Sequence, residues 1–93
     1  MLICRFAWDA EVMDEGRKRH LEEHRKHLRS GSINIVQSGV IYSVVGAQGR
    51  IGALIVFDVS TVDEVERFSA RDPYVLHGVY REVSIVRWDR TIG

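Results

Sequence analysis

The switch from strand to helix that decides the fold lies in residues 51–68, IGALIVFDVSTVDEVERF. Its first half holds the continuous apolar run Ala53–Phe57, which is typical of a strand buried on both faces. In its second half Thr61 precedes Glu64 at the spacing of a capping box, so we expect a helix to begin there. Residues at helical spacing give that helix one apolar face: Val62, Val65 and Phe68.

Upstream of this switch the chain reads as strand, helix and strand. Met1–Trp8 is rich in strand formers. The Glu-, Lys- and Arg-rich segment Ala10–Ser30 predicts a helix, which Gly31 ends because glycine readily adopts the left-handed backbone of a C-cap. Ile33–Val45 predicts a second strand, in which the internal Gly39 suggests either a bulge or a close approach of another group to the backbone. A hairpin turn over residues 46–49 then leads into the third strand, which we expect to end near residue 59.

Downstream of the switch, the helix should end at Asp72-Pro73, because the residue before proline is disfavoured in helical geometry. Tyr74–Tyr80 reads as an irregular connection and Glu82–Trp88 as a final strand. The order βαββαβ predicts a ferredoxin-like α+β fold, with a four-stranded antiparallel sheet and two helices on one face. We expect residues 1–93 to form a single domain.

The sheet face away from the helices should be apolar, which predicts a homodimer. We expect that face to carry these residues or their alternating neighbours: Ile3, Val36, Leu54, Ile55 and Val86. A bare apolar face of this size exceeds what a soluble monomer normally exposes. The same face of a second copy is the simplest cover.

Charge and cysteine usage exclude several classes of protein. Thirteen basic residues balance thirteen acidic ones, so the surplus of positive charge that a nucleic-acid binder needs is missing. Cys4 is the only cysteine, which rules out an intrachain disulfide, and its apolar neighbours suggest a small buried side chain. The chain shows neither a signal peptide nor an apolar run long enough to span a bilayer, so we expect a cytoplasmic protein without a membrane partner.

The helix predicted over residues 10–30 has an unusually polar side facing the core. Few apolar residues share that face: Met13, Leu21 and Leu28. Beside them, at spacings of four and three, lie His20, His24 and His27. Such histidines either ligate a divalent metal or are ordinary partly buried side chains. A single helix rarely presents three ligands convergently, so we expect no metal here.

His20 and Asp72 form the candidate catalytic pair. The first helix places His20 near the sheet, and Asp72 closes the second helix at the same layer. If the two side chains meet, the carboxylate fixes the imidazole tautomer and favours its protonated form, which suits acid/base catalysis. In the alternative interpretation Asp72 caps backbone groups of an Asx-Pro turn.

Several short motifs together resemble the YCII-related (YciI-like) domain family. They are Asp72-Pro73-Tyr74, Gly78-Val79-Tyr80, the closing strand to Trp88, His20-Leu21 followed eleven residues later by Gly31, and Ser38-Gly39. The resemblance covers essentially the whole chain and implies a dimeric α+β barrel with His20 and Asp72 as its catalytic residues. The sequence departs from the family pattern at Val40, where proline is usual, and in the short hairpin loop that follows.

The resemblance favours a small-molecule enzyme similar to muconolactone isomerases. His20 is expected to act as acid and base on a small, anionic, cyclic or aromatic-derived substrate. Asp72 is expected to orient the His20 imidazole. Further residues are expected to contact the ligand: Ser38, Gly39, Tyr74 and Tyr80. Arg5 and Arg81 are candidates to offset a substrate carboxylate, although such an arginine is more often a surface charge. Isomerisation, elimination and dehalogenation all remain open, and no cofactor is implied.

Two other functions fit the same pattern. The domain is alternatively a non-catalytic module that binds a small ligand or assists another protein, since a fold does not fix a function. Haem binding through one of the histidines is the third alternative. Loss of activity on replacing His20 distinguishes an enzyme, whereas ligand binding without turnover distinguishes a binding module.

Overall fold

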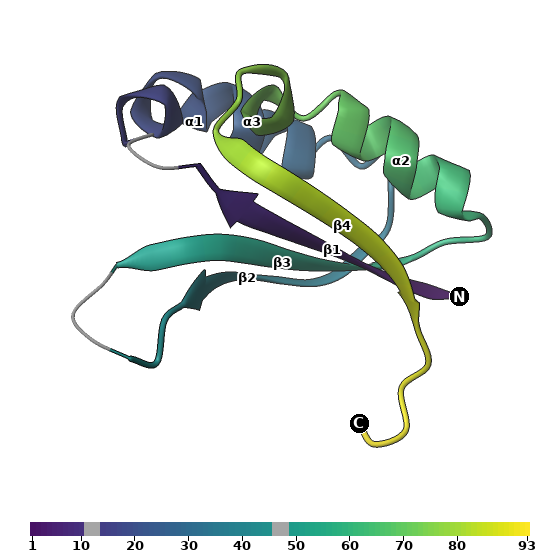
Figure 1. The fold of residues 1–93 in the computed structure, drawn as a ribbon. Helices are drawn as coiled ribbons and strands as arrows, with labels where there is room; N and C mark the ends of the chain where they lie inside the picture. The colour runs from purple at the N-terminus through teal and green to yellow at the C-terminus, as the bar shows by residue number, and fades with distance from the viewer. Residues whose placement is uncertain (11–13, 46–48) are drawn as a thin grey trace.

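One antiparallel sheet carries all the helices on one of its faces (Figure 1). The computed structural model describes residues 1–10, 14–45 and 49–93. The strands are β1 (Leu2–Asp9), β2 (Ile35–Tyr42), β3 (Arg50–Asp58) and β4 (Tyr80–Trp88), arranged in the order β2-β3-β1-β4. The helices are α1 (Asp14–Leu28), α2 (Val62–Ala70) and α3 (Pro73–Leu76). The ferredoxin-like βαββαβ order and the antiparallel sheet are therefore confirmed.

A short helix replaces part of the irregular connection predicted over Tyr74–Tyr80. Asp72 is the N-cap of α3, and its side chain accepts a hydrogen bond from the backbone N–H of Tyr74 at 2.9 Å. Pro73 occupies the first turn, where its fixed φ suits a helix and its missing N–H is not needed. The Asx-Pro interpretation of Asp72 was therefore right, and the turn continues into α3.

The strand-to-helix switch is built as predicted. The Glu64 carboxylate accepts hydrogen bonds from the backbone N–H groups of Thr61 and Ser60, at 2.9 and 3.0 Å. The Thr61 bond is the larger of the backbone contacts that hold the pKa of Glu64 below its usual value. Val65 and Phe68 then point into the core, whereas Val62 is 39% exposed and only borders it.

The main core lies between the sheet and α2. It is made of Ile3, Ile55, Phe57, Val59, Val65 and Phe68. Ile3 pairs with Phe57 across β1 and β3, and both point toward the helices. Ile3 and Ile55 therefore lie on the helix side, and it is their alternating neighbours, which the prediction also allowed, that lie on the open face. Because side chains alternate along a strand, a one-residue shift exchanges the two faces.

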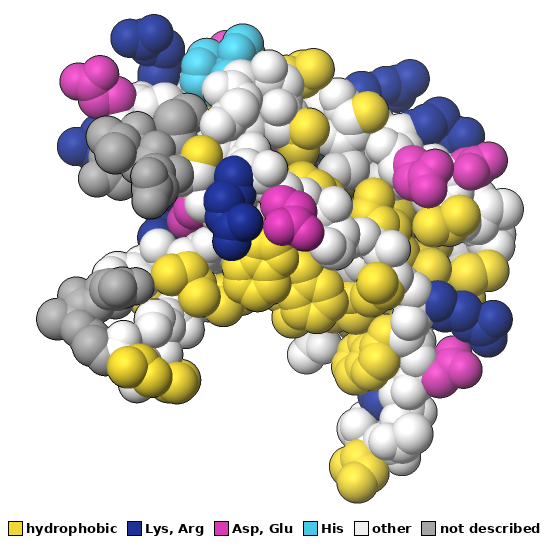
Figure 2. Space-filling view, in the orientation of Figure 1, with side chains coloured by type: hydrophobic (Ala, Val, Ile, Leu, Met, Phe, Trp, Pro, Cys, Tyr) yellow, Lys and Arg dark blue, Asp and Glu magenta, His cyan; other side chains and the backbone are white. Residues whose placement is uncertain are grey.

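The face of the sheet away from the helices is apolar, as Figure 2 shows along the underside of the molecule. The alternate residues of the strands supply it: Cys4, Phe6, Trp8, Leu54, Val56, Val86 and Trp88. Val86 is 45% exposed and Trp88 39% exposed in the single chain. Cys4 is buried beneath its neighbours, and desolvation raises the pKa of its thiol, which makes it a poor nucleophile.

Backbone irregularities of β2 differ from those predicted. Gly39 pairs in register with Leu54, and the register shifts instead occur between Ile35 and Gln37 and between Ile41 and Tyr42. Gly31 has the left-handed φ of 74° expected beyond the end of α1. The predicted start of the first helix, with Met13, and most of the hairpin turn over 46–49 lie outside the described residues. Within the described ranges, each helix is too short or too polar to cross a bilayer.

Candidate active site

The three histidines of α1 form its packing surface against the second half of the chain. His20 stacks on His77 with ring centroids 3.7 Å apart, and His24 stacks on Tyr74 at 3.8 Å. His27 stacks on Phe68 at 4.1 Å. Their spacings of four and three place them on one helical face, so each meets a different ring of α2, α3 or the residue that follows α3. The polar stripe that the sequence shows is therefore a row of aromatic contacts.

The three α1 histidines contact different groups, so their ring nitrogens do not share one partner. The ring nitrogen Nδ1 of His24 contacts Asp72, and Nε2 of His27 donates a hydrogen bond to the Phe68 carbonyl oxygen at 2.7 Å. Because each ring has its own partner, the three imidazoles do not converge on one ion.

Asp72 is the most heavily engaged polar side chain in the structure's described core. Its carboxylate is 0% exposed. It accepts hydrogen bonds from Arg5 Nη1 at 2.9 Å, from His24 Nδ1 at 2.7 Å and from the Tyr74 backbone N–H at 2.9 Å. Arg5, from β1, is also 0% exposed. One carboxylate therefore joins β1, α1 and α3.

The histidine that meets Asp72 is His24, whereas the sequence predicted His20. The first residue of the Asp72–His77 segment lies against His24, and its last residue stacks on His20. His20 and His24 are one helical turn apart and share a face, so spacing within α1 cannot distinguish them. The prediction for Arg5 was also wrong. Its side chain is neither a surface charge nor exposed to a substrate carboxylate, but is the buried ion-pair partner of Asp72.

The surroundings of Asp72 keep it ionised. Burial by itself would raise the pKa of Asp72, but the hydrogen bond from His24, the charge of Arg5 and the Tyr74 amide together lower it. An ionised carboxylate only accepts hydrogen bonds, so His24 Nδ1 must carry a proton. In the neutral imidazole, Nε2 is then the nitrogen left to accept a proton. Since the folded pKa lies below the unfolded value of about 3.9, the stabilisation is complete above that pH and is lost on further acidification.

A cavity of about 400 Å³ lies beside His24. Ser38 and Gly39 reach it from β2, Tyr74 from α3 and Tyr80 from the start of β4. All four residues predicted to contact a ligand thus line the cavity that His24 lines, and His20 is not among its lining residues. Val40, which departs from the family pattern, borders it as well. Its volume falls in the lower part of the range of about 300–1,000 Å³ seen for small-molecule sites.

Tyr80 lines the cavity and has an uncommitted, buried hydroxyl. Its side chain is 8% exposed, and its oxygen has no hydrogen-bond partner among the described residues. Burial raises the pKa of Tyr80 to about 12, so the hydroxyl stays protonated and can donate a hydrogen bond at neutral pH. The hydroxyl of Tyr74 is already used, because it donates to the Arg17 carbonyl oxygen at 3.1 Å. Sequence reasoning named both tyrosines but could not separate these roles.

Four arginines and several apolar side chains complete the lining of the cavity. Arg17 and Arg25 come from α1, Arg29 directly follows it, and Arg50 begins β3. Asp9, which is not a lining residue, pairs with Arg17 and Arg50. No Asp or Glu is among its lining residues within the described ranges. Such a lining favours an anionic ligand. Arg81, the other arginine that the sequence singled out, lies outside this cavity and is paired with Glu82 at 3.5 Å on the surface.

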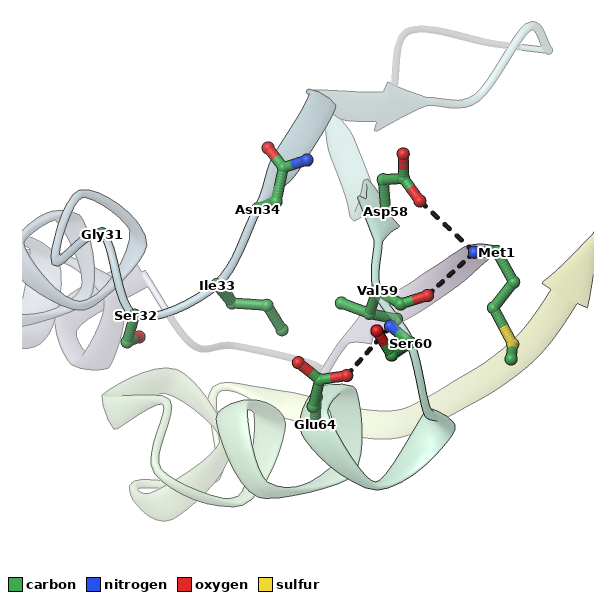
Figure 3. Close-up of a pocket in the computed structure, with 9 residues that line it drawn as sticks. All are labelled: Met1, Gly31, Ser32, Ile33, Asn34, Asp58, Val59, Ser60 and Glu64. Atoms are coloured by element: carbon green, nitrogen blue, oxygen red, sulfur yellow. Dashed lines mark hydrogen bonds and ion pairs between the residues drawn. The ribbon is translucent and has the colours of Figure 1, made fainter.

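A second, polar groove lies at the other end of β3 (Figure 3). The Met1 ammonium lies there, 3.3 Å from Asp58 Oδ1 and 2.8 Å from the Val59 carbonyl oxygen. Glu64 is occupied in capping α2 through Ser60. The charged groups of this groove are thus bonded to one another or to the backbone, so it offers weaker support for a reactive site than the His24 cavity.

The buried pair of Arg5 and Asp72 should be strongly coupled. Asp72→Asn leaves the Arg5 charge uncompensated, so it should lower the free energy of unfolding by about 3–5 kcal/mol. The double variant Arg5→Met/Asp72→Asn should lose less than the sum of the two single changes, by ~0.5–3 kcal/mol. Urea denaturation measures all three, with exposed Arg81→Met as the control, expected within about 0.5 kcal/mol of the wild type. Additive losses would show that the pair is not coupled.

Solved structures share the fold of this chain. It superposes with a TM-score of 0.82 on 5-chloro-2-hydroxyhydroquinone dehydrochlorinase (TftG) from Burkholderia phenoliruptrix AC1100, solved in complex with 2,5-dihydroxybenzoquinone. The two are 20% identical over 96% of this chain and 94% of that one. Protein At3g17210 from Arabidopsis thaliana gives a TM-score of 0.54 at 13% identity, covering 99% and 96% of the two chains. Hypothetical protein PHS023 from Pyrococcus horikoshii gives 0.52 at 13% identity, covering 92% and 87%.

Sequence comparison supplies the family. No curated protein matches the chain. The family model of the YCII-related domain matches residues 1–89, and so nearly the whole of the sequence. The match agrees with the motifs that run from His20 to Trp88. This chain belongs to the YCII-related domain family.

Proposed function

We propose that the cavity beside His24 is an active site in which His24 acts as acid and base on a small, anionic, hydroxylated ring compound. The observation that carries the proposal is the position of the His24 side chain. It is hydrogen-bonded to the buried Asp72 carboxylate, and it also lines the cavity. This replaces His20 by His24 in the pair that the sequence suggested and keeps Asp72 as the residue that orients the imidazole.

The remaining residues suit proton transfer next to a ring oxygen. Nε2 of neutral His24 accepts a proton from a hydroxyl or an acidic carbon of the substrate. The Tyr80 hydroxyl donates a hydrogen bond to the oxygen on which negative charge develops, and the arginines at the rim attract the anion. Ser38 and the Gly39 backbone close the side formed by β2.

The substrate class is supported by the dehydrochlorinase that shares this fold, whose structure holds 2,5-dihydroxybenzoquinone. A single hydroxylated ring also suits a cavity of about 400 Å³. For a chlorinated hydroxyhydroquinone the overall reaction is loss of hydrogen chloride. His24 moves one hydroxyl proton to the chlorine-bearing carbon, which gives a ketone tautomer of the ring. A second hydroxyl proton then passes to His24 and on to solvent, while chloride leaves with the electrons of the carbon–chlorine bond and a hydroxyquinone forms. For an unchlorinated substrate, the same base returns its proton to another ring atom, which is an isomerisation.

We also propose that a second copy of the chain covers the open face of the sheet. The apolar residues of that face include Val86 and Trp88, which are well exposed in the single chain. They continue the buried side chains of Cys4 and Val56 across neighbouring strands. Burial of such a continuous patch is favourable at about 25 cal/mol per Å² of apolar surface.

The ligand test uses 2,5-dihydroxybenzoquinone as the probe, with isothermal titration calorimetry at pH 7. The wild type should bind it, and Tyr80→Phe should weaken binding roughly tenfold or more, because a hydrogen bond to a charged oxygen contributes about 1.5–3 kcal/mol. Arg81→Met, outside the cavity, should bind like the wild type. Equal affinities of the wild type and Tyr80→Phe would count against this cavity as the site.

The catalytic test follows chloride release from 5-chloro-2-hydroxyhydroquinone. His24→Gln should lower kcat by about 10²–10⁴-fold, the usual contribution of a general base, while probe binding changes little. His27→Gln is the matched control, because it removes another α1 histidine that does not line the cavity. A loss in His20→Gln with His24→Gln unaffected would restore the pair suggested by the sequence. Probe binding without any chloride release in the wild type would favour the non-catalytic module for this substrate class.

The dimer is tested by light scattering coupled to size exclusion. The wild type should have twice the mass of one chain. Val86→Glu places a charge on the open face and should yield monomers, because an unpaired charge in an apolar interface is costly. Val62→Glu, on a residue of similar exposure at the start of α2, should stay dimeric. A monomeric wild type, or a dimer unchanged by Val86→Glu, would contradict the proposal.

A further inference from the structure

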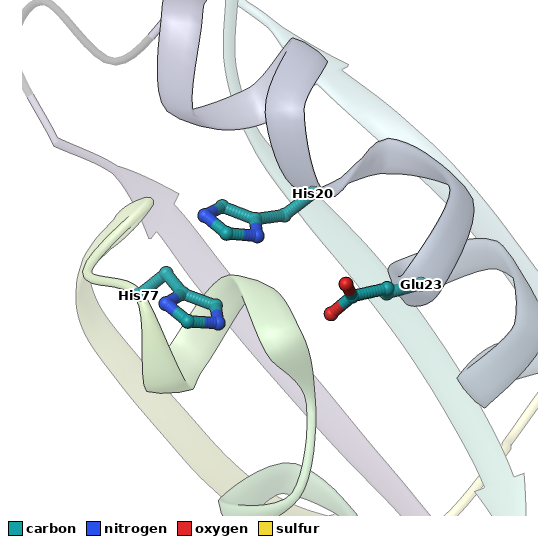
Figure 4. A group of neighbouring side chains, drawn as sticks. All are labelled: His20, Glu23 and His77. Atoms are coloured by element: carbon teal, nitrogen blue, oxygen red, sulfur yellow. The ribbon is translucent and has the colours of Figure 1, made fainter.

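We propose that His20, Glu23 and His77 form a binding site for a divalent transition-metal ion such as Zn²⁺. Their candidate ligand atoms all lie within 4.8 Å of one another. Figure 4 shows the two imidazoles and the carboxylate converging from α1 and from the residue that follows α3. None of the three lines the cavity beside His24, so this is a separate site.

The positions of the three residues follow from local structure. Glu23 comes three residues after His20 on α1, which places both on one helical face. His77 is the C-cap of α3, and its ring stacks on that of His20 at an interplanar angle of 1°. Each ring turns one nitrogen toward the Glu23 carboxylate in Figure 4. The chain thus presents two residues from one helix and one from another, which avoids the poor convergence of three ligands on a single helix.

The donor set suits zinc and its neighbours. Two imidazole nitrogens and one carboxylate oxygen form a known protein ligand set for Zn²⁺, with bonds of about 2.0–2.2 Å and one position left for water. His20 Nδ1 is buried and has no hydrogen-bond partner among the described residues. An unpaired buried nitrogen of this kind is unusual, and a metal ion would satisfy it.

Binding requires a small rearrangement that the structure permits. Stacked parallel rings direct their lone pairs side by side, so one ring must tilt before both can ligate one ion. His20 is partly buried in the helix packing, whereas His77 and Glu23 are exposed. We therefore expect His77 and Glu23 to move. The bound ion would link α1 to the end of α3, one helical turn from His24.

The test is a titration of the wild-type protein with Zn²⁺ by calorimetry. One ion should bind per chain. Loss of even an outer partner of a metal site commonly costs 10–100-fold in affinity, so His77→Ala and Glu23→Gln should each weaken binding by at least about tenfold. Glu22→Gln is the matched control, since Glu22 is the exposed neighbour of Glu23 outside the cluster, and it should bind like the wild type. Acidification should weaken binding in the wild type, because protons compete for the imidazoles.

A spectroscopic readout identifies the ligands. Added Zn²⁺ should shift the ¹⁵N NMR resonances of the His20 and His77 imidazole nitrogens and leave those of His27 in place. Co²⁺ should give the visible absorption of a tetrahedral or five-coordinate site. The proposal is overturned if His77→Ala and Glu23→Gln bind Zn²⁺ as tightly as the wild type. It is equally overturned if Glu22→Gln weakens binding as much as Glu23→Gln, or if the shifted signals belong to His24 or His27.

Discussion

A buried, ionised Asp72 is the constraint on which the rest of the structure depends. A carboxylate without solvent is tolerated only when its charge is compensated and its oxygens are hydrogen-bonded. Arg5 supplies the charge from β1, and His24 and the Tyr74 amide supply the remaining hydrogen bonds. Satisfying this one group fixes α1 over the sheet, sets the start of α3 and determines which nitrogen of His24 carries a proton.

The same contacts that stabilise the core prepare the cavity for chemistry. His24 is held between Asp72 and the ring of Tyr74, so its orientation is set before any ligand arrives. Tyr80, which also lines the cavity, lies near both the Tyr74 ring and the Arg5 guanidinium, and its buried hydroxyl remains unpaired among the described residues. Such preorganised donors and acceptors contribute most where water is excluded. Stability and the proposed activity therefore share the Arg5–Asp72–His24 group.

The sequence predicts the elements of this fold well because local signals agree with one another. The apolar run Ala53–Phe57 and the Thr61–Glu64 capping box both have the predicted structure. The identity of the histidine at Asp72 depends instead on how far α3 is displaced along α1, which no local signal encodes. The burial of Arg5 was also missed. A usable signal existed, because Arg5 lies on the same face of β1 as the apolar residues Ile3 and Ala7. Asp72-Pro73 also carried the signal for α3, since Asp is a favoured N-cap and Pro a favoured first helical residue.

The most direct test of the account is long-range ¹H–¹⁵N NMR of the four imidazoles in the wild-type protein, assigned with the single histidine variants. The account predicts that a slowly exchanging proton on Nδ1, hydrogen-bonded to a carboxylate, belongs to His24 and disappears in His24→Gln. His20 should show no such protected proton. A protected Nδ1 proton on His20, or its absence from His24, would contradict the pairing of His24 with Asp72 and with it the proposed active site.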